Sequence, residues 1–406
     1  MNLVFNKNNL TLNILVVTLI ILSGNPFVNH IGFEVAHLAF LIPLLAYSVY
    51  KGYFNKISQE LNFFLFFGFI FIFQAVYFSS FTLLTYAGFF TRALICLCVI
   101  ICVNDFYTRF VKVMYFLTKM GVGFWLLSFT GIFSVLTGFV EPLHQNEWTG
   151  EAAYSFLFHT LYVDEYGETL RNAGFFWEPG AFSAYIILAL ILLIVNERFF
   201  LKKEYKTYFV VFSIGVLTSM STMGYIALLM IFSIQAAIYF YRERTKIKKL
   251  SISMVAILIG FLSIVYFSNL YFVGEKISDQ LQKAAETSYL EYGENNTRFG
   301  SLLFDFYYIQ KSPVFGNGMH ESTRYSEHAL DTIASGHGNG LTDFVAKFGL
   351  LGFLFFIYCW VAFSRSSNLG PMLSIGLLLV LLTTLFSEPL FNYPLYWFMF
   401  FKSRPS

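Results

Sequence analysis

Residues 171–197, RNAGFFWEPGAFSAYIILALILLIVNE, decide the fold. A charged segment that contains glycine and proline, residues 171–180, runs directly into a long apolar stretch. A helix needs about 20 mostly apolar residues to cross a bilayer. Proline is favoured in the first helical turn, so Pro179 predicts the start of such a helix, with Glu178 just before it. The stretch therefore indicates a membrane helix with charged residues at its amino end.

The composition extends this prediction to the whole chain. Of the 406 residues, 57% are hydrophobic and only 12% are charged, whereas soluble domains are about 25% charged. We therefore predict an all-α polytopic integral membrane protein with one membrane domain, residues 1–406. Twelve spans are expected, or eleven if the short last run does not cross. The apolar runs lie near residues 11–24, 32–50, 62–79, 82–103, 110–139, 180–197, 207–220, 223–241, 251–272, 341–363, 370–387 and 390–401.

The distribution of Lys and Arg predicts the orientation. With the amino terminus in the cytoplasm, every basic cluster between these runs falls on the cytoplasmic side, and so does the carboxyl terminus. Two long connectors then face outward: residues 141–172, and residues 273–340 with amphipathic helices. Long loops in a compact protein are usually functional. The segment at residues 171–180 is therefore expected at the outer surface.

Arg171 and Glu178 are the first candidate site residues. The amino end of a helix favours an anion, and an arginine can add a bidentate contact to a phosphate. The alternative is that Arg171 and Glu178 pair with each other and only anchor the loop. Because charge at membrane depth is costly and usually functional, the sequence favours a site.

A second candidate stretch is NNTRFGSLLFDFYYIQKSPVFGNG, residues 295–318. Apolar residues recur in it at helical spacing, and Pro313 ends the run. We predict an amphipathic helix on the outer face of the membrane, with Arg298 at its start. The alternative for Arg298 is contact with lipid headgroups alone.

His337 lies between glycines just before the run at 341–363. A histidine there can act as a base or a phosphate partner, although a lone loop histidine is more often simply solvated. The preceding segment places four polar residues on one face if it is helical: His320, Arg324, His328 and Asp331. No metal-ligand spacing is present, so we expect no metal.

Arg92 and Glu388 are two further charges at membrane depth or at its edge. A mid-membrane arginine costs about 2.5–3.5 kcal/mol on insertion scales. Arg92 is thus expected to face a cavity, a lipid-linked phosphate or a structural partner. Glu388 is expected to pair with one of the arginines, mainly in a structural role. Because no nucleotide-binding motif is present, energy or an activated donor must come from elsewhere. A donor that already carries a phosphate leaving group would meet that need, and no cofactor is expected.

These motifs resemble those of a known family. The pattern R-x-x-G-x-x-x-E-P-G resembles the signature of Wzy-type O-antigen polymerases; its residues are Arg171, Gly174, Glu178, Pro179 and Gly180. Arg298 with the later Gly316-Asn317-Gly318 resembles the second large loop of that superfamily. LTSMSTMGYI, residues 217–226, resembles its Ser/Thr-rich helix junction.

The superfamily also contains the O-antigen ligases, which carry His-[Asn/Ser/Gln]-x9-Gly-x-x-Gly. Asn339, Gly349 and Gly352 fit this spacing, but Gly338 intervenes between His337 and Asn339. This departure weakens the transfer of the ligase histidine role to His337. The Glu-Pro pair favours a polymerase.

The resemblance implies a GT-C-type glycosyltransferase of the bacterial inner membrane that acts on the periplasmic face. Its substrates would be glycans linked to undecaprenyl pyrophosphate, with membrane lipids and a chain-length regulator protein as candidate partners and no nucleic acid. Arg171, Arg298, Arg92 and Arg324 would bind pyrophosphate, and Glu178 or His337 would act as the base. Supporting roles would fall to Gly174, Pro179, Asn339 and Glu388.

Two other functions compete with polymerisation. An O-antigen ligase would share the donor but use lipid A-core as the acceptor. A lipid-linked oligosaccharide flippase belongs to a different class, and transporters usually carry charge near the bilayer midplane in repeated halves. The chain shows no internal repeat, and its ionisable residues gather in the two outer connectors. The sequence therefore favours an enzyme.

Overall fold

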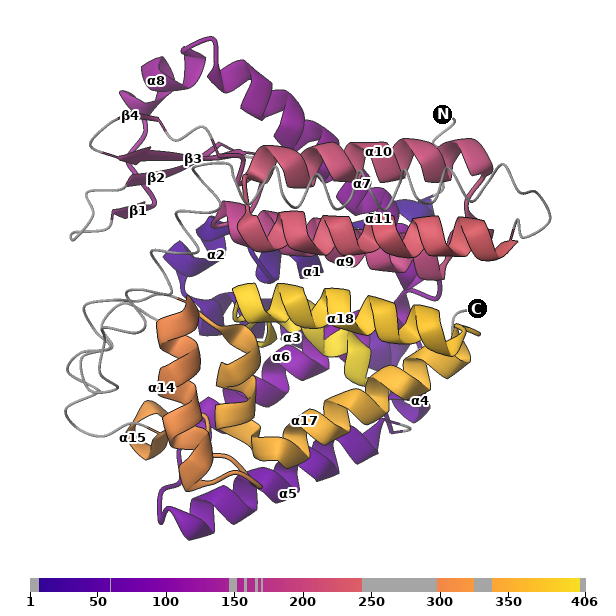
Figure 1. The fold of residues 1–406 in the computed structure, drawn as a ribbon. Coiled ribbons are helices and arrows are strands. Elements are labelled where there is room, and N and C mark those ends of the chain that lie inside the picture. Colours follow the sequence, from indigo (N-terminus) through magenta and orange to yellow (C-terminus); the bar gives the residue numbers. More distant parts are fainter. Residues whose placement is uncertain are drawn as a thin grey trace. The chain divides into compact units, whose positions relative to one another are not determined.

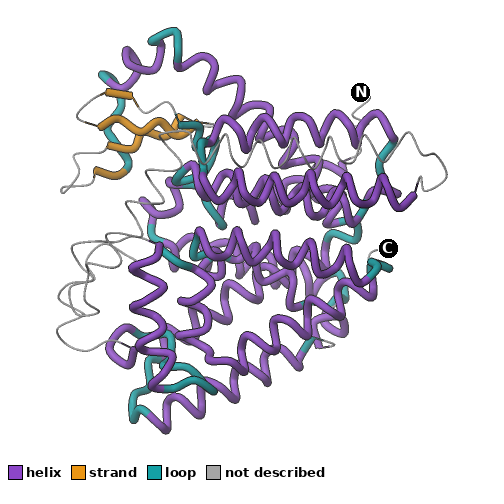
Figure 2. The backbone as a smooth tube through the Cα atoms, viewed as in Figure 1, coloured by secondary structure: helices purple, strands orange, loops and turns teal. Residues whose placement is uncertain are grey.

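The computed structural model describes residues 7–58, 60–145, 152–156, 159–164, 167–168, 171–242, 298–324 and 338–401. Over these residues the chain is mostly helical (Figures 1 and 2). It forms two compact units. The first consists of Met1–Ser221, Leu354–Asn368 and Leu390–Ser406, and the second of Thr222–Phe353 and Leu369–Pro389.

The first unit contains the amino-terminal helices. They are α1 (Lys7–Leu22), α2 (Pro26–Ile31), α3 (Phe33–Tyr50), α4 (Phe54–Ser58), α5 (Leu61–Tyr77), α6 (Leu83–Cys102), α7 (Phe106–Ser128), α8 (Ile132–Thr137), α9 (Pro179–Val195) and α10 (Lys202–Ser219), with a 3-10 turn at Glu197–Phe199. Helices therefore occupy the first seven predicted runs, but the run at 110–139 is divided between α7 and the short helix α8, with Gly131 in the left-handed region between them. Of these helices, α3, α6 and α7 are long and apolar enough to cross a membrane, whereas the apolar parts of α1, α5 and α9 are shorter.

Helix α9 lies in the core of the first unit. All of its residues from Pro179 to Ile194 are buried, and it packs against α7 and α10. A helix that is hydrophobic on every side is a core helix. The apolar run after Glu178 is thus a helix that begins at Pro179, as predicted. Other helices of the first unit cover it on all sides.

The last predicted span, residues 390–401, is wrong as an α-helix. The chain forms two 3-10 segments there, Leu390–Asn392 and Pro394–Phe400. Pro394 disfavours helical geometry at the residue before it, and Tyr393 is extended. The second segment is entirely buried, and the ring of Trp397 packs 4.6 Å from that of Phe89. Aromatic packing therefore takes the place of a spanning helix.

The first long connector contains a small antiparallel sheet, which an all-α chain would lack. Its strands are β1 (His144–Gln145), β2 (Ala152–Phe156), β3 (His159–Asp164) and β4 (Gly167–Glu168), in that spatial order. In the central pair, Tyr154 lies opposite Leu161. Neighbouring antiparallel strands need only short connections, which is why so short a connector can hold four of them.

The second unit contains α11 (Thr222–Arg242), α14 (Arg298–Lys311), α15 (Glu321–Arg324), the first half of α17 (Gly340–Ser366) and α18 (Pro371–Ser387). Helix α11 packs against α18. These helices confirm the predicted runs at 223–241, 341–363 and 370–387 as helical, and α17 is long and apolar enough to cross a membrane. The run predicted at 251–272 lies outside the described residues.

Glycine breaks the regular geometry of α17. Gly349 has φ 68° and ψ −174°, a conformation that side chains disfavour. A Cβ at this position would lie 2.1 Å from the backbone oxygen of Val314. Gly349 is thus required for close contact between α17 and the segment that follows α14.

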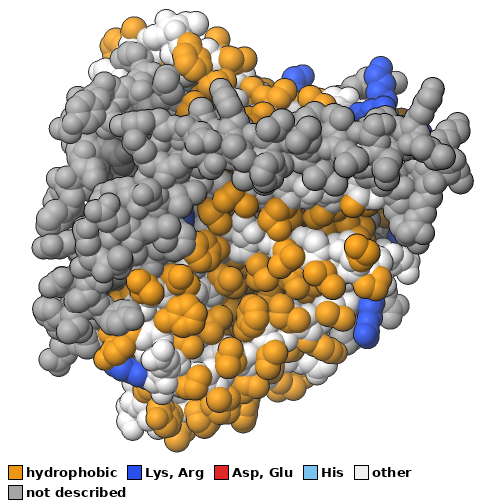
Figure 3. All heavy atoms as spheres, in the orientation of Figure 1, with side chains coloured by type: hydrophobic (Ala, Val, Ile, Leu, Met, Phe, Trp, Pro, Cys, Tyr) orange, Lys and Arg blue, Asp and Glu red, His pale blue; other side chains and the backbone are white. Residues whose placement is uncertain are grey.

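The described surface carries many exposed apolar side chains, and Figure 3 shows them as a broad hydrophobic area on one face. In α5, for example, Leu65, Phe69 and Ile72 are all exposed. Soluble monomers rarely expose apolar patches of this kind. Together with the apolar helices, this surface is that of a polytopic membrane protein.

Candidate functional site

Glu178 is the amino-terminal cap residue of α9. Its backbone is extended, with φ −156° and ψ 161°, and its side chain does not cap the helix. Instead its Oε1 accepts a 3.2 Å hydrogen bond from Nε1 of Trp177. The pairing of Arg171 with Glu178 therefore stays a prediction, and the side-chain partner that the structure gives for Glu178 is the Trp177 indole.

The backbone of residues 174–177 is fixed by the turn between α1 and α2. Nδ2 of Asn25 donates to the carbonyl of Phe175 (3.0 Å), and the amide of Trp177 donates to the carbonyl of Gly24 (3.1 Å). Gly174 has φ 52°, and a Cβ there would lie 2.7 Å from the ring of Phe182. Only glycine fits this position without strain. The segment before α9 is thus held in one conformation.

Arg92 lies in α6 of the same unit. Its Nε is buried and has no hydrogen-bond partner in the structure. The guanidinium is within electrostatic range of Glu34 and Tyr393, and the ring of Tyr393 stacks on Trp177 at 4.5 Å. Arg92 therefore lies on the same side of the first unit as Trp177 and Glu178.

Trp177 and Tyr393 were not among the predicted site residues. Both are partly exposed, and they connect the segment before α9 to the carboxyl-terminal 3-10 segments. The only sequence signal was Trp177 next to Glu178, because Tyr393 lies more than 200 residues further along the chain. Arg171, at the start of the segment, is half-buried.

Arg298 and Glu388 form the central ion pair of the second unit. Arg298 begins α14, and its Nη2 lies 3.1 Å from Oε1 of Glu388. Its Nε donates to the carbonyl of Ser387 (3.0 Å), the last residue of α18. Glu388 is only 3% exposed and needs a cation, since an unpaired buried carboxylate is costly. The expectation that Glu388 pairs with an arginine is confirmed.

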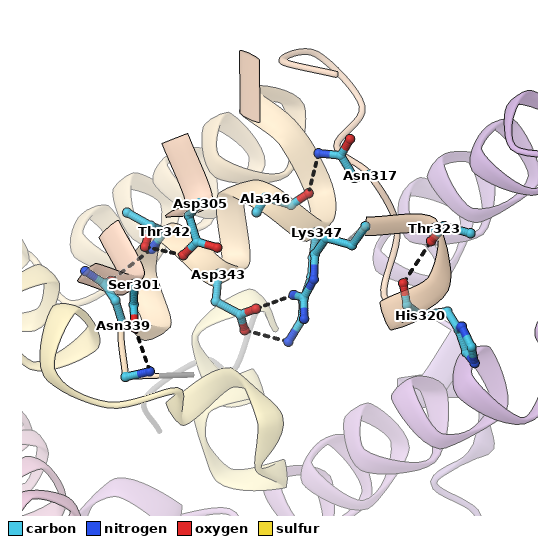
Figure 4. A network of polar contacts seen from close by, with 12 residues as sticks. Ser301, Asp305, Asn317, His320, Thr323, Asn339, Thr342, Asp343, Ala346 and Lys347 are labelled. Carbon is cyan, nitrogen blue, oxygen red and sulfur yellow. Dashed lines mark hydrogen bonds and ion pairs between the residues drawn. The ribbon is translucent and has the colours of Figure 1, made fainter. Parts of the chain in front are cut away.

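Asn339 caps α17, as Figure 4 shows. Its Oδ1 accepts the amide of Thr342 at 3.1 Å, which satisfies one free N–H of the first turn. Its Nδ2 is buried and has no hydrogen-bond partner. This arrangement leaves a buried amide donor at the amino end of a long helix.

The glycines on either side of Asn339 bring this end of α17 close to α14 and α18. The amide of Gly338 donates to Oγ of Ser301 in the first turn of α14 (3.1 Å). A Cβ on Gly340 would lie 2.0 Å from the carbonyl oxygen of Glu388. The amino ends of α14 and α17 therefore meet beside the Arg298–Glu388 pair. His337, the residue before Gly338, lies outside the described residues, as do His328 and Asp331.

Helix α14 is amphipathic, but its buried face carries polar residues. Ser301, Phe304, Asp305 and Tyr308 are buried, whereas Phe306 is 49% exposed. Asp305 accepts a 2.5 Å hydrogen bond from Oγ1 of Thr342. The face of α14 that packs against α17 is therefore the one that carries polar hydrogen-bonding residues (Figure 4). Of the apolar positions at helical spacing, Leu302 and Ile309 are half-buried and Phe306 is exposed. The sequence did not point to Ser301 and Asp305, because their hydrogen-bond partners, Gly338 and Thr342, each lie 37 residues further along the chain.

Arg324 lies in a buried charge cluster with Asp343 and Lys347. Arg324 and Lys347 both bond the Asp343 carboxylate, and Arg324 is only 6% exposed. Among the described residues, this cluster holds two cations and one carboxylate. The guanidinium of Arg324 is thus engaged by the Asp343 carboxylate.

Together these features define a mostly helical membrane protein with charged residues near the amino ends of α9, α14 and α17. The comparison with known families agrees. Residues 207–357 match a family model described as O-antigen ligase, and this match confirms the resemblance to the O-antigen polymerase/ligase superfamily. It includes Arg298, Arg324 and Asn339, while the segment before α9 lies outside it.

One curated relative is an uncharacterized protein of Haemophilus influenzae, 29% identical over 189 residues. The alignment covers 42% of the chain and 46% of the relative, so the chain matches about half of that protein's length. No solved structure matches the chain.

Proposed function

We propose that the protein is an O-antigen polymerase that joins oligosaccharide repeat units carried on undecaprenyl pyrophosphate, at the periplasmic face of the inner membrane. The observation that carries the proposal is the arrangement around Arg298. There a guanidinium, two helix amino ends and the unpartnered amide of Asn339 lie together. Helix amino ends and arginines favour phosphate groups. The match to a family model described as O-antigen ligase supports a role in surface-polysaccharide synthesis.

In the proposed reaction a hydroxyl of the acceptor unit attacks the anomeric carbon of the donor glycan. The new glycosidic C–O bond forms as the bond to the pyrophosphate oxygen breaks, and the bonding electrons leave with undecaprenyl pyrophosphate. The proton of the acceptor hydroxyl passes to a base. Glu178 and His337 are the two candidates for that base. Pyrophosphate is a good leaving group, so cations that stabilise its charge are sufficient and no metal is required.

The cations have separate roles in this proposal. In the second unit, Arg298 contacts the pyrophosphate, and Glu388 orients the guanidinium of Arg298. In the first unit Arg171 and Arg92 bind phosphate near the amino end of α9. Arg324 contributes through the net charge of its cluster with Asp343 and Lys347. Gly174, Pro179 and Asn339 maintain the backbone geometry.

Ligation to lipid A-core is the second candidate. The description of the matched family favours it, as does the spacing of Asn339, Gly349 and Gly352. Polymerisation is preferred because Glu178 and Pro179 form the amino end of α9 as a polymerase signature would require. The two reactions use the same donor and differ only in the acceptor.

Deletion of the gene in its native host, followed by gel electrophoresis of lipopolysaccharide, separates these functions. A polymerase predicts core carrying one repeat unit, with the ladder lost. Bare core, with polymer retained on the lipid carrier, would indicate a ligase. Loss of periplasmic lipid-linked units would indicate a flippase, and an unchanged ladder would contradict a role in O-antigen altogether.

A further inference from the structure

Asn172 ties the segment before α9 to the carboxyl end of α10 within the first unit. Its backbone amide donates to the carbonyl of Thr218 at 3.0 Å. Its Nδ2 donates to Oγ1 of Thr218 at 2.9 Å, and its Oδ1 accepts the amide of Gly174 at 2.8 Å. Asn172 is fully buried. The side-chain amide therefore closes a local turn with its oxygen and makes a long-range contact with its nitrogen.

The anchor on α10 is itself rigid. Oγ1 of Thr218 donates to the carbonyl of Gly215 at 3.0 Å while it accepts from Asn172, so both functions of the hydroxyl are used. A Cβ on Gly215 would lie 2.5 Å from Thr118 and 2.8 Å from Ile186, which shows how closely α10 approaches α7 and α9. The contact point for Asn172 has little freedom to move.

The same segment is also fixed from the sheet. The amide of Thr160 in β3 donates to the carbonyl of Gly174 at 2.6 Å. Residues 172 and 174 are thus bonded to two different elements of the first unit, directly after Arg171. The backbone that carries the Arg171 side chain is held immediately on its carboxyl side.

We infer that Asn172 is a positioning residue for Arg171, and that Thr218 in the LTSMS segment is its anchor. The inference rests on the proposed function, in which Arg171 binds phosphate. A cation on a fixed backbone binds an anion better than one that must first be ordered. Breaking the side-chain bond between Asn172 and Thr218 loosens this backbone, although its main-chain bonds remain, and it leaves the charge of Arg171 unchanged.

The test measures binding of undecaprenyl pyrophosphate to the purified full chain in lipid nanodiscs. Thr218→Val and Asn172→Ser break the same bond from its two ends, and Thr218→Ser is the matched control that keeps the hydroxyl. We expect the first two variants to bind about tenfold more weakly and the control to bind within about twofold of the parent. The double variant Arg171→Ala/Thr218→Val should bind no more weakly than Arg171→Ala alone.

The outcomes separate this inference from the proposed function. If Arg171→Ala binds like the parent, the phosphate role of Arg171 fails, and the positioning role with it. If Arg171→Ala loses binding while Thr218→Val and Asn172→Ser keep it, only the positioning role is overturned. Additive losses in the double variant would also overturn it. If Thr218→Val does not fold, the comparison of Asn172→Ser with Thr218→Ser decides the question.

Discussion

The guanidinium of Arg298 donates to two acceptors at the carboxyl end of α18: the carboxylate of Glu388 and the carbonyl of Ser387. A helix carboxyl end attracts cations, and the buried carboxylate adds a charged acceptor. Arg298 is thus held by two bonds on one edge of its guanidinium, with the side chain 23% exposed. That geometry leaves the cation oriented and partly open.

The first prediction concerns Glu388. Glu388→Gln keeps the shape and one acceptor but removes the charge that orients Arg298. We expect polymerisation to fall about tenfold, equivalent to about 1.4 kcal/mol, with a smaller effect on the melting temperature. Glycan length profiles and thermal unfolding of the purified variant measure the two effects. Unchanged glycan length would remove Glu388 from the site.

A second prediction tests the required geometry of Gly174. Gly174→Ala adds a Cβ 2.7 Å from the Phe182 ring at a positive φ, so we expect a loss of stability of about 1–3 kcal/mol. Gly68→Ala in α5 is the matched control, because nothing lies within 4 Å of its added Cβ. That control should be neutral or slightly stabilising. Equal melting temperatures for the two variants would contradict the close packing at Gly174.

The third prediction is that substitution of Arg92 changes activity and stability in different directions. Arg92→Met removes a cation whose buried Nε has no hydrogen-bond partner and replaces it with an apolar side chain. Since burying a charged group carries a desolvation cost that an apolar side chain does not, we expect an equal or higher melting temperature together with a loss of polymer. Arg92→Lys, which keeps the charge, should retain part of the activity. A variant that is destabilised yet fully active would instead assign Arg92 a structural role.

His159 predicts how the first unit responds to acid. Burial lowers the pKa of His159 to about 4 from 6.5, and its ring packs 5.3 Å from Phe133. As the pH falls from 6.5 towards 4, the unfolded chain binds a proton that the folded chain does not, so stability falls. The loss is about 1 kcal/mol at pH 5.5.

Thermal unfolding of the parent and of His159→Phe between pH 7.5 and 5 measures this effect. The substitution keeps an aromatic ring against Phe133 but cannot titrate. Its melting temperature should therefore depend less on pH than that of the parent. Equal pH dependence of the two proteins would show that His159 is not the group responsible.

Much of the fold could be predicted because membrane helices leave a local signal. The apolar run after Pro179, the stop at Pro313 and the helical run at 341–363 were all readable from the sequence. The run at 390–401 was misread because its apolar residues serve aromatic packing around Trp397. Composition alone does not distinguish a buried 3-10 segment from a short span. The strands of the first connector were missed because each has only a few residues.

The candidate residues were found by type and motif, but not their partners. The bond between Asn172 and Thr218 joins residues 46 positions apart, and that between Arg298 and Glu388 joins residues 90 positions apart. Contacts at such separations depend on tertiary packing. No local pattern predicts that Asn339 caps α17 while its Nδ2 has no partner.

The most direct test of polymerisation uses the purified protein in liposomes with undecaprenyl-pyrophosphate-linked repeat units extracted from the deletion strain. The account predicts glycans of two or more units on the lipid carrier. One undecaprenyl pyrophosphate should be released for each new bond, and Arg298→Ala should abolish both products. Absence of elongation, with transfer appearing only when lipid A-core is added, would contradict polymerisation and establish ligation.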